Sequence, residues 1–263
     1  LLTIQQFRRA LRLVTACEFL RVYGLGQGGP IGWRPKKCDI KDDFIWGTKR
    51  FSIGLWVGGH VAPNRLRTIR SRKDRLICGA IDILKNPKLA LYYGEPAQVL
   101  NCPVCGAILA VPRKGLEPNK IHKIHWTISS RTLSNTGIQK LVRQFLSGRE
   151  YNIGGGKVVI HSVSLHQIHS EYFVITIAIR SEVPVEPVTL QKLFEMIQDD
   201  LRARSESSFP VLVDIKLLAT HPSRPGYFII KERLPSKSRK GFSEEETNLE
   251  IFCTNPDCDL NRS

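Results

Sequence analysis

The stretch Asn101-Cys102-Pro103-Val104-Cys105-Gly106 is the most specific local signal in this sequence. Two cysteines separated by two residues, with proline between them and glycine after the second, are typical of a tight knuckle that turns both thiolates toward one Zn²⁺. A tetrahedral structural zinc site needs two further ligands, and the other close pair of cysteines, Cys253 and Cys258, has an allowed spacing. We therefore predict a structural zinc site formed by Cys102, Cys105, Cys253 and Cys258, a zinc ribbon split into two halves.

Residues 106–252 separate the two cysteine pairs, which is far more than the spacing within an ordinary zinc finger. The intervening chain must therefore leave the site and return to nearly the same point. A compact inserted domain with adjacent ends meets this requirement, whereas a structureless loop of this length does not. The cysteine spacing thus predicts a folded insert.

Hydrophobic periodicity within residues 121–232 supports such an insert. Apolar residues alternate in four segments and recur at helical spacing in two others. The predicted strands are 124–128, 158–165, 172–179 and 211–218, the predicted helices are 137–148 and 189–204, and a further strand is expected at 227–231. The order strand, helix, strand, strand, helix, strand predicts a ferredoxin-like βαββαβ module with both helices on one face of an antiparallel sheet. The third of these strands lacks the aromatic pattern of RNA-binding sheets, which favours a scaffold or partner-docking role.

The positive charge is concentrated before the knuckle. The chain has a formal net charge of +15, and the first 120 residues hold 21 Lys and Arg against 8 Asp and Glu. Nucleic acid is therefore the first expected partner and an acidic membrane surface the second. No run of about 18 apolar residues occurs, so we expect no membrane-spanning helix. Seven cysteines, an odd and sparse set, indicate a reducing compartment, and we expect a cytoplasmic location.

Four local patterns describe the basic segment. A helix is expected from Thr3 to Gly24, a glycine-rich loop over 24–32 that is not a P-loop, and a strand over 51–57. If residues 65–76 are helical from Asn64 as N-cap, Arg65, Arg72 and Lys73 share one side. This basic face could neutralise phosphates, or it could be an ordinary solvated surface.

A resemblance to a known family rests on four stretches of the sequence. They are Leu2-Thr3-Ile4-Gln5-Gln6-Phe7, residues 51–58 with Ala62-Pro63-Asn64, residues 94–106, and Phe252-Cys253-Thr254-Asn255-Pro256-Asp257-Cys258. Together they resemble the large superfamily 2 helicase-like subunits of the DISARM type of bacterial antiphage defence. The likeness covers about residues 1–110 and 249–263. It implies a region of mixed α/β (α+β) structure, within or beside a RecA-like lobe, between the ATP-binding loop and the Walker B motif.

The resemblance implies an ATP-dependent DNA helicase or translocase, with DNA and other defence subunits as partners. Neither ATPase motif occurs in this sequence, so ATP and Mg²⁺ would be cofactors of the full-length protein alone, and we expect no catalytic residue here. Ala62-Pro63-Asn64-Arg65-Leu66 is similar to the Thr-Pro-Gly-Arg motif with which such helicases touch a nucleic-acid backbone. The resemblance thus implies nucleic-acid contacts for Asn64 and Arg65.

These patterns predict five parts of the chain, and they leave more than one function open. The parts are a basic helicase-lobe segment (1–100), the first half of the zinc ribbon (101–120), the inserted domain (121–232), a linker (233–248) and the second half of the ribbon (249–263). Because residue 1 is Leu, we expect an internal piece of a longer polypeptide. The alternative is a stand-alone, zinc-stabilised module that binds nucleic acid or protein without ATPase activity. A hydrolase that uses the histidines is a third possibility, but no His-Glu-x-x-His motif occurs.

Overall fold

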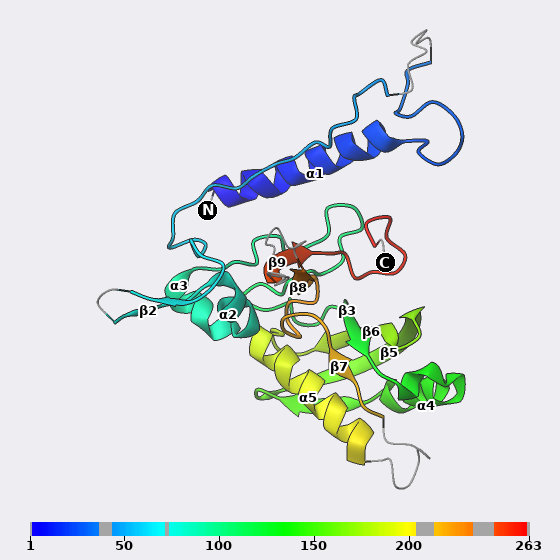
Figure 1. The fold of residues 1–263 in the computed structure, drawn as a ribbon. Coiled ribbons are helices and arrows are strands. Elements are labelled where there is room, and N and C mark those ends of the chain that lie inside the picture. Colours follow the sequence, from blue (N-terminus) through cyan, green and yellow to red (C-terminus); the bar gives the residue numbers. More distant parts are fainter. Residues whose placement is uncertain (1, 37–43, 72–73, 204–212, 234–244, 262–263) are drawn as a thin grey trace, which may run out of the picture. The chain divides into compact units, whose positions relative to one another are not determined.

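The computed structural model describes residues 2–36, 44–71, 74–203, 213–233 and 245–261. The chain forms two units, Leu1–Val57 and Gly58–Ser263, and its structure is mixed α+β (Figure 1). Among the described residues, no helix combines the length and the apolar character needed to cross a bilayer. Each unit is described by itself below.

The first unit is built on one long helix. Helix α1 spans Leu2–Val22, as predicted, and Gly24, with φ of +85°, directs the chain out of it. The chain then runs back along the helix, where the amide of Phe51 donates to the Glu18 carboxylate at 3.1 Å. The bidentate ion pair with Arg21 lowers the pKa of Glu18 to about 2. The strand predicted over residues 51–57 is not formed. The amide of Phe51 donates to the Glu18 carboxylate instead of to a neighbouring strand.

The second unit opens with a small hairpin and short helices. Strands β1 (Ile69–Arg70) and β2 (Leu76–Ile77) pair antiparallel, and α2 (Ala80–Lys85), η1 (Pro87–Leu89) and α3 (Ala90–Tyr93) follow. The helix considered for residues 65–76 is therefore not formed by its described residues. The extended conformation is held by Thr68, whose hydroxyl donates to Asp82 and accepts from the amide of Gly79 at 2.9 Å. These bonds fix an extended chain on the start of α2.

A curled five-stranded antiparallel sheet forms the centre of the second unit (Figure 1). Its strand order is β4-β5-β6-β3-β7, and every neighbouring pair is antiparallel. The elements are β3 (His122–Ser129), η2 (Thr132–Ser134), α4 (Thr136–Leu146), β4 (Glu150–Ile153), β5 (Gly156–His169), β6 (Tyr172–Ser181), α5 (Pro187–Ala203) and β7 (Lys216–Leu217). Register shifts between Ile160 and Ser162 and between Gln167 and His169 bend the long strand β5.

The alternation that predicted these strands is confirmed by burial. Ile124, Trp126 and Ile128 of β3 are fully buried, and they pack with the inward residues of α5. The Trp126 ring meets Phe194 edge to face at 4.9 Å, and its indole N–H donates to the carbonyl of Pro222 at 2.8 Å. This bond connects the sheet to the segment that follows β7.

Three parts of the sheet region differ from the expectation. Strand β4 was not predicted, and it pairs with β5 through a turn in which Gly154 and Gly155 have positive φ. Of the predicted strand 211–218, residues 216–217 pair with β3, while 211–212 lie outside the described residues. The strand expected at 227–231 is confirmed as β8 (Tyr227–Arg233), but it pairs with β9 (Glu245–Ile251) in a separate sheet. Strand β9 includes residues 245–248 of the expected linker.

Candidate metal centre

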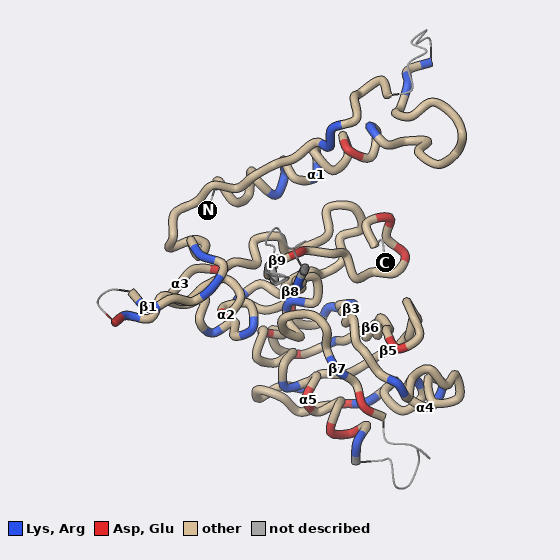
Figure 2. Tube along the Cα trace, in the orientation of Figure 1, with Lys and Arg blue, Asp and Glu red and all other residues tan. Residues whose placement is uncertain are grey.

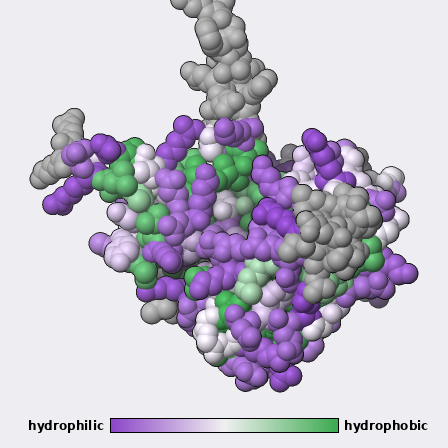
Figure 3. Space-filling model, turned by 90° about the horizontal axis from the view of Figure 1, so that it is seen from below, coloured by the Kyte–Doolittle hydropathy of each residue, from purple (hydrophilic) through white to green (hydrophobic). Residues whose placement is uncertain are grey.

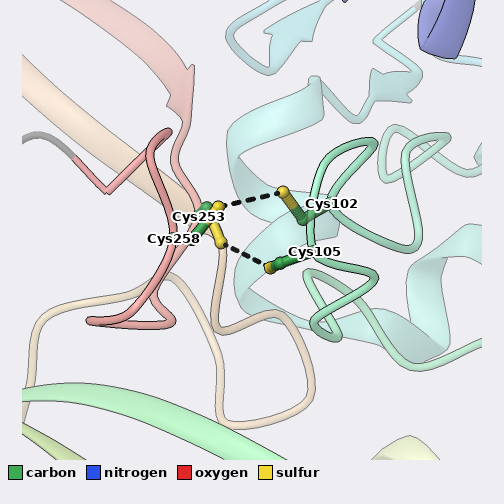
Figure 4. A group of neighbouring side chains, drawn as sticks. All are labelled: Cys102, Cys105, Cys253 and Cys258. Carbon is green, nitrogen blue, oxygen red and sulfur yellow. Dashed lines mark hydrogen bonds between the residues drawn. The ribbon is translucent and has the colours of Figure 1, made fainter.

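Four cysteine side chains from two distant segments meet in the second unit (Figure 4). Their sulfur atoms all lie within 4.8 Å of one another. The Sγ atoms of Cys102 and Cys258 are 3.8 Å apart, and those of Cys105 and Cys253 are 3.5 Å apart. The structure thus brings together all four cysteines that the sequence predicted as one group. Within the part of the chain that is described, no other cluster of His, Cys, Asp or Glu side chains could hold a metal ion.

The first pair of cysteines lies in a tight turn. The amide of Cys102 donates to the carbonyl of Ala107 at 2.8 Å, and the amide of Gly106 donates to the carbonyl of Cys102 at 3.0 Å. Gly106 has φ of +75°, a conformation that favours glycine. The turn also points the amide of Ala107 at the sulfur of Cys105, 3.5 Å away. The amide dipole of Ala107 therefore points at the Cys105 sulfur, which stabilises the thiolate form of that side chain.

The second pair is held by an asparagine turn. The amide of Cys258 donates to the carbonyl of Asn255 at 3.1 Å, and the amide of Asp257 donates to the Asn255 side chain at 3.2 Å. The amide of Leu260 lies 3.4 Å from the Cys258 sulfur and donates to it. The first half of the cluster thus supplies a backbone donor to Cys105, and the second half supplies backbone donors to Cys258 and, from Asn255, to Cys253.

Burial shifts the pKa of these thiols away from that of a thiol in water. Cys102, Cys253 and Cys258 are buried, and Cys105 is exposed. Burial raises the pKa of both Cys253 and Cys258. Burial also opposes ionisation of Cys105, but hydrogen bonds from Ala107, Asn255 and the neighbouring thiols of Cys253 and Cys258 together outweigh it and lower the pKa of that thiol to about 7. A bound dication would reverse the effect of burial, because metal binding deprotonates its thiol ligands.

The sulfur spacing fits a tetrahedral zinc ion. Zn–S bonds of about 2.3 Å in a tetrahedron separate the sulfur atoms by about 3.8 Å. The two sulfur separations of 3.5 and 3.8 Å agree with this value and exceed a disulfide bond of about 2.05 Å, and the remaining sulfur pairs lie within 4.8 Å. Four soft sulfur donors suit Zn²⁺ better than Mg²⁺ or Ca²⁺, which prefer oxygen.

Polar contacts that the sequence did not reveal hold the same junction together. Arg224 is 2% exposed, and its guanidinium contacts both carboxylate oxygens of Glu95 at 2.7 Å. The Tyr227 hydroxyl donates to the carbonyl of Val99 and accepts from its amide, each at 3.0 Å. Glu95 lies in a stretch that carried the family resemblance, but no local signal marks Arg224 as its partner. The partners are 129 residues apart in sequence, so periodicity and spacing could not pair them.

Of the residues expected to contact nucleic acid, the structure describes two. Asn64 and Arg65 are exposed and lie in an irregular segment before β1. The carbonyl of Arg65 accepts a hydrogen bond from the amide of Ala80 at 2.8 Å, so its backbone is fixed. Arg72 and Lys73 lie outside the described residues.

The described histidines do not gather into a group of potential metal ligands. His125 on β3 is buried and contacts the Thr176 hydroxyl at 2.8 Å, and burial lowers its pKa. His221 is also buried, between Ser223 and Gln191. Neither belongs to a group of potential metal ligands in the described ranges.

Comparisons with known proteins give one partial similarity. No family model matches the chain, and no solved structure matches it. The chain is 31% identical over 117 residues to a protein named DISARM protein DrmA from Bacillus paralicheniformis, strain ATCC 9945a. The match covers 44% of this chain but 8% of the relative. Part of this chain is therefore similar to a short region of DISARM protein DrmA.

Proposed function

We propose that this chain is a zinc-stabilised, nucleic-acid-binding region of a DISARM-type helicase-like protein. The convergence of four cysteine sulfurs, together with the similarity to DrmA, carries the proposal. In this proposal the ATPase motifs, with ATP and Mg²⁺, belong to other parts of the protein, and the present region contributes structure and DNA contacts. Other defence subunits are the expected protein partners.

Zinc would serve a structural role. Cys102 and Cys105 lie before the sheet in sequence, and Cys253 and Cys258 lie after it, so one ion would join the two ends of the insert. Metal binding contributes folding free energy directly, on the order of 10 kcal/mol in zinc-finger peptides. It would also offset the loop-closure entropy of the long chain between the pairs.

For the finer architecture, we propose a ferredoxin-like insert beside a RecA-like lobe. The strand order β5-β6-β3-β7, with α4 and α5 in the crossovers, supports the ferredoxin-like part, and β4 would be an addition at one edge. The RecA-like part rests on the family resemblance alone.

Nucleic-acid binding is proposed from the charge of the chain. The net charge of +15 favours a polyanionic partner, and DNA is the expected one. The proposed contacts are Asn64, Arg65, Arg72 and Lys73. Of these, the described residues Asn64 and Arg65 lie just before β1, and Arg70 and Arg75 are further exposed arginines nearby in the sequence.

Zinc content per chain tests the metal site. Elemental analysis of the purified chain should give one equivalent of zinc, and the Cys102→Ser and Cys258→Ser variants should each lose it. Cys17→Ser is the matched control, because Cys17 is exposed and lies outside the cluster. Retention of a full equivalent in both cluster variants would refute the assignment.

The DNA part is tested separately by fluorescence anisotropy with a 20-base-pair duplex. Binding should weaken steeply as salt rises, because each neutralised phosphate releases counterions. No binding at low salt would refute this part and leave the metal site unaffected.

The second candidate is a stand-alone, zinc-stabilised binding module, which the cysteine cluster fits equally well. The complete reading frame separates the two candidates. ATP-binding motifs on both sides of this region support the helicase-like protein, and their absence supports the module.

A further inference from the structure

We infer that the β1–β2 hairpin, with its approaches, is an arm that enters a groove of duplex DNA. This inference rests on the proposed nucleic-acid binding and names the element that makes the contact. It differs from contact through Arg65, Arg72 and Lys73 on a helix, because Ile69–Arg70 and Leu76–Ile77 pair as antiparallel strands. A two-stranded ribbon is narrow enough for the major groove, and strands also enter the minor groove of DNA.

The arm is strongly basic. Residues 65–75 contain six Lys and Arg and one acidic residue, Asp74. Arg67, Arg70 and Arg75 are all exposed. Figure 2 marks Lys and Arg positions in blue along the chain around β1. The one acidic side chain pairs with Arg70 at 3.6 Å, but both partners are more than three-quarters exposed, so this ion pair is weak. DNA phosphates can therefore displace it at little cost.

Aliphatic side chains are exposed on the same arm. Leu76 is 54% exposed and Ile77 is 39% exposed, and they pair in register with Arg70 and Ile69. The arm on the left of Figure 3 has hydrophilic surface toward its end and hydrophobic surface toward its base. Proteins that bind DNA grooves combine arginines with aliphatic side chains that contact or wedge between bases. The arm carries both kinds of side chain.

The composition of the arm also selects among nucleic acids. Single-strand binding relies on aromatic rings that stack on bases, and residues 65–77 contain no aromatic residue. The deep, narrow major groove of A-form RNA does not admit side chains. Duplex DNA is therefore the ligand that fits.

The base of the arm is rigidly attached. The amides of Ala80 and Ile81 donate to the carbonyls of Arg65 and Leu66 at 2.8 and 3.1 Å. A side chain at Gly79 would lie 2.3 Å from the backbone of Arg67, so the two segments are in close contact. Arg67 also donates to the Thr247 hydroxyl of β9 at 2.7 Å. Because its base is already ordered, the arm loses less conformational entropy when it inserts into a groove.

The test measures anisotropy of a fluorescent 20-base-pair DNA duplex, and of one of its single strands, with the zinc-loaded chain. The variant Arg70→Gln/Arg75→Gln should bind the duplex at least tenfold more weakly at 100 mM salt, with a log–log salt slope shallower by about 2. The variant Leu76→Ser/Ile77→Ser should lose about tenfold in duplex affinity with an unchanged slope, because it removes contacts with bases and not with phosphates. Duplex should bind more tightly than the single strand.

Two control variants match these changes elsewhere in the unit. Lys140→Gln/Arg143→Gln removes two exposed charges from α4, and Leu141→Ser removes an aliphatic side chain that is 37% exposed. Circular dichroism and zinc content verify that every variant is folded.

The outcomes separate the arm from the proposed function. If the hairpin variants lose no more affinity than the controls while the parent chain binds DNA, DNA binding by the arm is refuted and the proposed function stands. If the serine variant alone has no effect, or the single strand binds equally well, groove insertion is refuted. If the parent chain does not bind DNA, the proposed function itself fails.

Discussion

At the scale of single residues, the Arg224 guanidinium bridges segments that are remote in sequence. It donates to both carboxylate oxygens of Glu95 and to the carbonyl of Ile83, and it is almost completely buried. Glu95 in turn accepts from the amide of Ala97 at 2.8 Å. Removing one partner of a buried ion pair leaves the other charge uncompensated, which costs more than the pair itself contributes.

We therefore expect Arg224→Met to lower the free energy of unfolding by about 3 kcal/mol. Urea unfolding of the zinc-loaded chain measures this change. Arg202→Met is the control, because the Arg202 side chain is half exposed in its ion pairs and should cost less than about 1 kcal/mol. The Arg224→Met/Glu95→Gln double variant should be less destabilised than the sum of the single variants. Additive effects would contradict the coupling.

His221 makes stability depend on pH. Its Nδ1 accepts from the amide of Ser223 at 3.1 Å, so the proton of the neutral ring lies on Nε2, 3.2 Å from Gln191. Burial, with the charge of Arg224 added, lowers the pKa of His221 to about 4, whereas an unfolded histidine has a value of about 6.5. Below pH 6.5 the unfolded chain binds a proton that the folded chain does not.

Stability from this group is therefore complete above pH 6.5 and falls as the pH approaches 4. The loss should reach about 3 kcal/mol. The variant His221→Gln keeps hydrogen-bonding groups without titrating, so the difference between parent and variant in urea midpoints at pH 7 and pH 5 isolates the effect. A difference that does not change between these two pH values would argue against the buried neutral ring.

At the scale of elements, helix α5 covers the sheet with one face. Leu190, Leu193, Phe194, Ile197 and Leu201 are buried against the sheet, and Met196 on the same helix is 38% exposed. The contact of Phe194 with Trp126 lies at the centre of this packing. Helix and sheet thus depend on a few large side chains.

Phe194→Ala should destabilise the chain by about 3–5 kcal/mol, because it removes a buried ring and leaves a cavity. Thermal unfolding followed by circular dichroism measures the change. Met196→Ala should shift the midpoint by much less, since that side chain is already partly in water. Equal shifts for the two variants would contradict the packing described here.

At the scale of the whole molecule, the second unit has two separate apolar cores. The larger one fills the space between the sheet and helices α4 and α5. The smaller one contains Leu84, Ala97, Leu109, Tyr227 and the buried cysteines. Zinc would act on the second core alone.

Removal of zinc by a chelator should therefore loosen the smaller core and spare the larger. Hydrogen exchange followed by mass spectrometry should become faster in residues 100–110 and 249–260 after chelation, while β3, β5 and β6 keep their protection. The same experiment on Cys102→Ser should give the chelated pattern without added chelator. Loss of protection throughout the sheet would mean that the cores unfold as one.

The sequence predicted those features whose signal lies in spacing or period. The cysteine pairs have the spacing of zinc ligands, and Ile124, Trp126 and Ile128 alternate because one face of β3 is buried. The β1–β2 hairpin was missed because its apolar residues fit a helix as well as a ribbon, and the bonds from Thr68 to Gly79 and Asp82 decide between them. The ion pair of Arg224 with Glu95 depends on the tertiary fold, because the two residues are 129 apart in sequence and no local pattern links them.

Hydrogen bonds between the segment before β3 and the segment after β7 have an evolutionary consequence. The amide of Val111 donates to the carbonyl of Ser223 at 2.8 Å, and the amide of Gly226 donates to the carbonyl of Leu109 at 3.0 Å. The chain therefore enters and leaves the αβ part, from β3 to β7, through two segments that are hydrogen-bonded to each other. A gene can gain, exchange or lose such a cassette while the sulfur-bearing turns keep their places, so descendants of one ancestor can carry unrelated inserts on the same junction.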